Sequence, residues 1–234
     1  MKTALVVFAA SAVAIAGISG VFAADAQTPA AQPASAVMAE AHARGALRPV
    51  SDFASISDRN ARSIALFEEA GKVITHPRCT NCHPVSTPSQ GDERRPHMPA
   101  VSFGEAGMGA AGMPCVSCHT AKNVWVGGVQ TVTVPGNPRW SLAPKEMAWQ
   151  GKSLGDICRQ LKDTRRNGGK TMDEMVEHMA HDDLIAWGWD PGEGRTPAPG
   201  TQAQFGELIK AWVDTGAACP SGGPVVPSHD LPTE

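Results

Sequence analysis

Two copies of one short motif dominate the sequence, CTNCH at residues 79–83 and CVSCH at residues 115–119. Each copy places two thiols three positions apart, with a histidine directly after the second thiol. This is the pattern by which haem c is attached to a protein. The thiols add to the two vinyl groups of the porphyrin, and the adjacent imidazole binds the iron from the proximal side. The repeat therefore predicts two covalently bound haems c.

The motif assigns a role to each of its reactive residues. The expected cofactor-binding residues are the thiols and the histidine of each copy: Cys79, Cys82, His83, Cys115, Cys118 and His119. His83 and His119 would be the proximal ligands of the two irons. Two CxxC pairs also suit a four-cysteine zinc site. Because both copies carry the adjacent histidine and the spacer is long for a compact zinc module, haem is the favoured interpretation.

Each iron has a second axial position, and three residues are the main candidates for it. His97 lies in the proline-rich loop between the motifs, where the chain can fold back over a porphyrin. His178 lies on a predicted helix beside methionines at helical spacing, which are either core residues or a cover for a haem. Met147 is the best methionine candidate, and a methionine ligand would raise the reduction potential relative to two histidines. Weaker candidates are His76, His181 and Met113.

The N-terminal segment has the features of a signal peptide. Lys2 supplies a positive charge, residues 4–18 form an apolar run, and small residues follow. We expect residues 1–26 to be removed on export to the periplasm. The alternative is an uncleaved membrane anchor, but the run is short for a span, and no other segment could cross a bilayer. Residues 27–50 are rich in Ala and Pro and are expected to form a flexible linker.

Two of the six cysteines lie outside the motifs, Cys158 and Cys219. An even pair in an exported chain favours a disulfide, which would stabilise the fold by roughly 4 kcal/mol if unstrained. The alternative is two free buried thiols. The formal net charge is −3 and no basic run is present, so we expect no nucleic-acid partner.

The sequence predicts a mainly α fold, with cytochrome c-like helices and long loops wrapped around two haems. Tyrosine is absent and only 5% of the residues are aromatic, so the haems are expected to supply part of the core. Helices are expected over residues 58–71, 153–168, 171–187 and 201–215. Ser57 is the expected cap of the first, and Thr171–Glu174 and Thr201–Gln204 are expected capping boxes. A short strand is possible over residues 129–134.

One di-haem domain is expected over residues 51–220. Its haem-attachment part would cover residues 70–138, and its helical, disulfide-stapled part residues 139–220. Residues 221–234 are rich in Pro and Gly and are expected to form a disordered tail.

Several longer strings resemble a known family. They are HPRCTNCHP, MPCVSCHTAKN, SLAPKEMAWQGKSLGDICRQLKD, EHMAHDDLIAWGWDPGEGRTPAPGTQ and FGELIKAWVDTGAACP. From residue 76 onward the chain is similar to the di-haem c-type cytochromes commonly labelled isoquinoline 1-oxidoreductase subunit. The resemblance implies electron transfer with an exported molybdenum hydroxylase, while the chain itself shows no molybdopterin or iron–sulfur motif. Relatives often carry a histidine where this chain has Ser141, which argues against a required ligand there.

These features predict a periplasmic carrier of single electrons. It would pass electrons from a dehydrogenase, such as a molybdenum hydroxylase, to another redox protein, with no catalytic residues of its own. The alternative is a haem enzyme, peroxidase-like or acting on another small molecule, in which one iron keeps an empty sixth position. The spin state of the ferric haems would separate the two.

Overall fold

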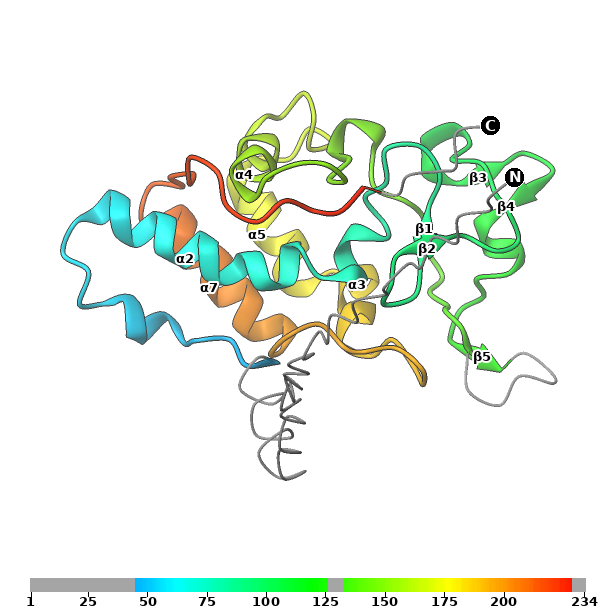
Figure 1. Ribbon diagram of the computed structural model, residues 1–234, viewed down its shortest axis with the longest axis horizontal. Helices are drawn as coiled ribbons and strands as arrows, with labels where there is room; N and C mark the ends of the chain where they lie inside the picture. Colours follow the sequence, from blue (N-terminus) through cyan, green and yellow to red (C-terminus); the bar gives the residue numbers. More distant parts are fainter. Residues whose placement is uncertain (1–44, 126–132, 229–234) are drawn as a thin grey trace, which may run out of the picture.

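The computed structural model describes residues 45–125 and 133–228. It is helix-rich, with a group of helices on one side and a looped region with short hairpins on the other (Figure 1). The α-helices of the described residues are α2 (Arg59–Ile74), α3 (Pro77–Thr80), α4 (Leu154–Lys162), α5 (Met172–His181), α6 (Asp183–Ala186) and α7 (Gln202–Asp214). Short 3₁₀ helices are η1 (Val50–Phe53), η2 (Glu105–Gly107), η3 (Cys115–Ser117), η4 (Lys145–Met147) and η5 (Trp187–Trp189).

The strands form three separate antiparallel pairs of two residues per strand. They are β1 (Ser89–Gln90) with β2 (Arg95–Pro96), β3 (Gly109–Ala110) with β4 (Met113–Pro114), and β5 (Val124–Trp125) with β6 (Thr133–Val134). The predicted strand over residues 129–134 is therefore described only at its last two residues, and residues 126–132 lie outside the described part. Among the described residues, no helix has the length and apolar character needed to cross a membrane.

Helix capping follows the sequence closely. The capping boxes Thr171–Glu174 and Thr201–Gln204 are both present, which confirms the predicted starts of α5 and α7. Ser153, where a helix was expected to begin, caps α4 and forms a third capping box with Asp156. The first helix differs, because Asp58 and not Ser57 provides the cap, accepting a hydrogen bond from the Ala61 amide at 2.6 Å.

Two predicted helix ends were wrong. The helix opened by Thr171 stops at His181 and not at residue 187, because Asp182 takes an extended conformation and caps the new helix α6. The helix opened by Ser153 stops at Lys162, and turns follow it up to residue 168. Each end coincides with an aspartate, whose side chain competes with the helix for backbone hydrogen bonds.

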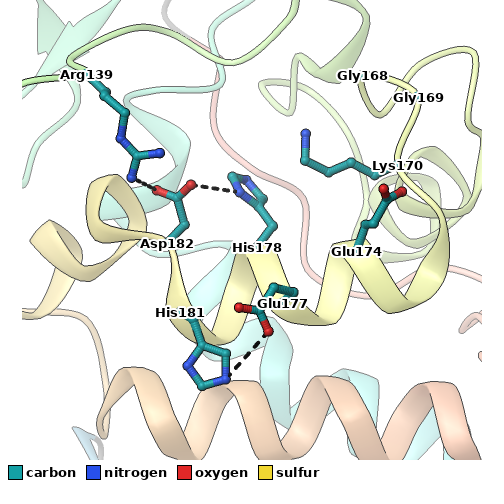
Figure 2. A pocket seen from close by; sticks show the side chains of 9 residues that line it. All are labelled: Arg139, Gly168, Gly169, Lys170, Glu174, Glu177, His178, His181 and Asp182. Atoms are coloured by element: carbon teal, nitrogen blue, oxygen red, sulfur yellow. Dashed lines mark hydrogen bonds and ion pairs between the residues drawn. The ribbon is translucent and has the colours of Figure 1, made fainter.

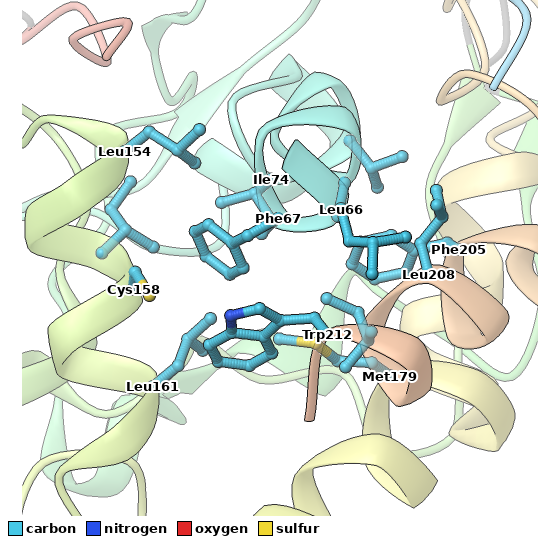
Figure 3. Packing of buried hydrophobic residues seen from close by; sticks show 14 of the residues in the cluster. Leu66, Phe67, Ile74, Leu154, Cys158, Leu161, Met179, Phe205, Leu208 and Trp212 are labelled. Atoms are coloured by element: carbon cyan, nitrogen blue, oxygen red, sulfur yellow. The ribbon is translucent and has the colours of Figure 1, made fainter. Parts of the chain in front are cut away.

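The main core lies between α2, α4, α5 and α7 (Figure 3). At its centre Phe67 of α2 packs against Trp212 of α7, with ring centroids 4.7 Å apart. The close approach of α5 to α7 depends on Gly206, since a Cβ at this position would lie only 2.5 Å from that of Ala180. Leu, Ile and Phe side chains fill the rest, so this part of the molecule has an apolar core made by the chain itself.

The predicted cysteine pair is confirmed. The Sγ atoms of Cys158 and Cys219 are 1.96 Å apart and their Cα atoms 5.6 Å apart, which is bonding geometry. The bridge joins α4 to the segment that follows α7.

Residues 222–226 pack against the start of α4, which corrects the predicted disordered tail. The carbonyls of Pro224 and Gly222 accept hydrogen bonds from the amides of Leu154 and Gly155, at 2.9 and 2.8 Å. Those amides belong to the first turn of α4, where the helix itself offers no acceptor. Val226 is fully buried. We call residues 222–226 the C-terminal strap.

The last residues of the predicted linker, from residue 45 onward, belong to the folded domain. Leu47 is buried in the main core, and the carbonyl of Gly45 accepts a hydrogen bond from Gly200 at 2.8 Å. The domain therefore begins by residue 45 and not at residue 51. The expected signal peptide at residues 1–26 and most of the predicted linker lie outside the described residues.

Candidate functional site

The first CxxCH motif is formed by α3 and the turn that follows it. His76 caps α3 by accepting a hydrogen bond from the Arg78 amide at 3.2 Å, and Pro77 occupies the first helical position. The Cys82 amide donates to the Cys79 carbonyl at 3.1 Å, so the two thiols lie one turn apart. Both thiols line a cavity of about 240 Å³. Burial raises the pKa of Cys79 to about 12 and that of Cys82 to about 11, so both are protonated thiols near neutral pH.

His83 is held in one orientation at the wall of this cavity. Its Nδ1 lies 2.7 Å from the carbonyl oxygen of Met147, and because a carbonyl only accepts, Nδ1 carries the proton. The imidazole stacks on Trp149, with centroids 3.5 Å apart and planes 8° from parallel. Burial lowers the pKa of His83 to about 4, so the ring is neutral. A neutral ring with Nδ1 engaged leaves Nε2 as the free ligand atom.

The second motif repeats this arrangement on η3. Nδ1 of His119 lies 2.8 Å from the carbonyl oxygen of Pro135, and its ring stacks on Trp140 at 4.5 Å and 7°. Burial lowers the pKa of His119 as well. Both motif histidines are therefore neutral, bonded to a backbone carbonyl through Nδ1 and backed by a parallel tryptophan. The two motifs differ at the second thiol, since Cys118 is exposed while Cys82 is half-buried.

His97 faces His119 across the second site. The ring centroids are 5.9 Å apart and the planes differ by 62°. Nδ1 of His97 lies 2.9 Å from the Pro99 carbonyl, so its Nε2 is also free. A metal–imidazole bond is about 2 Å long, so two imidazoles on opposite sides of one iron have ring centres roughly 6 Å apart. The observed separation matches that value.

His178 contributes to the first site from α5. It lines the same cavity as Cys79, Cys82 and His83, together with Met175 of the same helix. Its Nδ1 lies 3.4 Å from the carboxylate of Asp182. Burial lowers the pKa of His178, and the negative charge of Asp182 opposes that shift.

The remaining ligand candidates have other contacts. Met147 lines the first cavity, but its carbonyl accepts the hydrogen bond from His83 Nδ1. This contact favours a role for Met147 on the same side as His83 rather than opposite it. His76 is used as a helix cap. His181 is mostly exposed and lies 3.8 Å from Glu177. Met113 is 43% exposed on β4.

The two motifs are joined by the segment from Trp140 to Ala143. The Ala143 amide donates to the Cys82 carbonyl at 2.9 Å, and the Leu142 amide donates to Gly107, beside the second motif, at 3.0 Å. Trp140 stacks on His119 and also lines the cavity of the first motif. The sequence did not single out the roles of Trp140 and Trp149, because both lie far along the chain from the histidines that they contact.

Two buried donors at the first cavity have no hydrogen-bond partner among the described residues, Arg78 Nε and Trp149 Nε1. Buried N–H groups are nearly always paired, so these two indicate a missing acceptor. The described residues contain no group of three His, Cys, Asp or Glu side chains placed to hold a metal ion. No family model, curated protein or solved structure matches the chain.

Proposed function

We propose that the protein is a di-haem c-type cytochrome that carries single electrons. One observation carries the proposal: the two CxxCH histidines have the same environment at two unrelated places in the chain. Each is neutral, bonded through Nδ1 to a carbonyl, and stacked on a tryptophan. Bound histidines in metal sites have this second contact, which fixes the tautomer and aims Nε2 at the metal.

The residues around the first motif fit a haem. The cavity is mainly apolar, as a porphyrin requires, and the thiols of Cys79 and Cys82 lie at its wall beside His83. Arg78 Nε and Trp149 Nε1, which have no partner among the described residues, could donate to carboxylates, which are the polar groups of haem, while Nη2 of Arg78 is already paired with Asp92. When bound, haem supplies one-electron cycling between Fe(III) and Fe(II).

The chain's own part is to anchor, orient and cover the cofactor. The thiols would hold the porphyrin, the imidazoles of His83 and His119 would bind the iron, and the apolar wall of the cavity would limit the access of water. A second histidine faces each site, His97 near His119 and His178 beside the cavity of His83. Two histidines on each iron would favour electron transfer over the binding of small molecules, so we propose electron transport rather than catalysis.

The partners follow from the family resemblance and from the expected export. We propose a periplasmic dehydrogenase, of the molybdenum hydroxylase type, as the electron donor, and another redox protein as the acceptor.

Mass spectrometry of protein produced with a c-type cytochrome maturation system tests the proposal. The expected mass is that of the processed chain plus two haems. Replacing both thiols of the first motif, Cys79→Ala with Cys82→Ala, should remove one haem, and Cys115→Ala with Cys118→Ala the other. Purified enzyme of the molybdenum hydroxylase class should then reduce the wild-type protein. A mass without any porphyrin would overturn the proposal.

A further inference from the structure

We propose that Asp182 is a positioning residue that holds His178 as the second axial ligand of the haem bound to the first motif. The proposal rests on the proposed function. It adds which histidine binds which haem and how the reduction potential of that haem is set.

His178 lies between two cavities. One is the apolar cavity of the first motif, and the other is an open surface pocket of about 550 Å³ lined mostly by charged side chains, among them Arg139, Lys170 and Asp182. Figure 2 shows the imidazole between Arg139 and Asp182 on one side and Lys170 on the other. The ring therefore stands at the boundary between the interior and the polar surface.

The contact with Asp182 determines which nitrogen is free. Nδ1 of His178 is 3.4 Å from Oδ2 of Asp182, and because a carboxylate only accepts, this contact favours the proton on Nδ1. Nε2 is then left for the iron. His97 and the two motif histidines also have Nδ1 engaged, but their partners are neutral carbonyls. Within the described part of the chain, His178 is the only one of these four histidines with a charged acceptor near its Nδ1.

Asp182 is itself fixed from the opposite side. Its Oδ1 accepts the Leu184 amide at 2.8 Å, which caps α6, and lies 3.4 Å from the Arg139 guanidinium. The cap thus explains why α5 stops at His181: the break places a carboxylate one turn after His178, beside its Nδ1.

This arrangement has an electronic consequence. A carboxylate bonded to a ligating imidazole raises the basicity of the ligand. A more basic ligand stabilises Fe(III) relative to Fe(II), so Asp182 should lower the potential of one haem. The positive charge of Arg139 partly offsets the negative charge of Asp182 and should therefore reduce this lowering of the potential.

The central experiment compares Asp182→Asn with Asp183→Asn in the fully matured protein. Asparagine is as good a helix cap as aspartate, so Asp182→Asn removes the charge and keeps the start of α6. Asp183 is the matched control, because its carboxylate is 3.7 Å from Arg139 and its side chain is 86% exposed. Each variant is examined by mass spectrometry, potentiometric titration and electron paramagnetic resonance of the ferric form.

We expect Asp182→Asn to raise one of the two midpoint potentials and to alter one ferric signal, with two haems still attached. Asp183→Asn should leave both signals unchanged. Arg139→Gln should shift the same potential downward, and His178→Ala should convert that haem alone to high spin. Two attached haems with a ferric signal unchanged by both Asp182→Asn and His178→Ala would overturn this inference and leave the proposed function standing. Absence of haem from the wild-type protein would instead overturn the proposed function.

Discussion

The clearest assignment at the scale of single residues is the pair His97 and His119. The predicted ligand role of His97 remains a prediction, but the loop now places it opposite a motif histidine at 5.9 Å, a separation that the sequence could not give. The proposed roles of the motif residues could be read from the sequence because haem attachment requires fixed spacing. The supporting tryptophans and Asp182 were not readable, because their roles depend on how distant segments fold together.

His97→Ala should convert the proposed second haem to high spin, since the imidazole opposite His119 is lost. The ferric optical spectrum measures this change. His181→Ala is the control, because His181 is a mostly exposed histidine on α5 that lies 3.8 Å from Glu177. An unchanged low-spin spectrum in His97→Ala would show that another residue binds this iron.

Buried histidines should make the haem-free chain sensitive to acid. The pKa of His76 and that of His83 are both lowered from 6.5 to about 4, mainly by burial. The unfolded chain therefore binds more protons than the folded chain between these values, and stability rises with pH. The free energy of unfolding should be constant above about pH 6.5 and should fall as the pH drops toward 4.

The variant His76→Asn isolates one of these groups. Asparagine can still cap α3 but does not titrate, so the loss of stability between pH 6.5 and 4 should be smaller than in the wild type. At pH 8, where both histidines are neutral, wild type and variant should have nearly equal stability. Urea unfolding at a series of pH values measures both quantities, and an identical pH dependence would contradict the assignment.

At the scale of elements, helix starts were predictable and helix ends were not. A cap depends on residues three positions apart, as Thr171 and Glu174 show. The ends of α4 and α5 each fall at an aspartate whose carboxylate accepts a hydrogen bond from the amide two residues further on, and a single aspartate is too common in helices to mark an end in the sequence.

The contact between α2 and α7 should dominate the stability of the helical part. Trp212 is fully buried against Phe67, so Trp212→Ala should lower the free energy of unfolding by about 3–5 kcal/mol. Trp125→Ala is the matched control, because Trp125 is 55% exposed and its removal leaves no cavity. Chemical denaturation of the two variants gives the comparison, and equal losses would contradict the described packing.

At the scale of the whole molecule, the described residues combine a helical part with its own core and a looped part that carries the second motif and most of the hairpins. The mainly α class was predictable from periodicity and caps. The extent of the folded domain was not, because the short apolar segments around Leu47 and Val226 carry no periodic signal, yet both are buried.

The disulfide should stabilise the molecule without controlling haem attachment. It closes a separation of 61 residues, and replacing Cys158 and Cys219 by serine should cost roughly 4 kcal/mol. Thermal unfolding with and without reductant measures this loss. Because both sulfur atoms lie outside the motifs, the haem content should be unchanged, and a loss of haem would show that the bridge is needed for maturation.

The C-terminal strap bears on how far the chain can be shortened. A truncation directly after the disulfide would keep every cysteine and helix, yet it would remove the acceptors for Leu154 and Gly155. The start of α4 would then fray, and the side chain of Leu154 would lose its packing contact with Gly223. The shortest fragment that retains the native α4 should therefore extend at least to Val226.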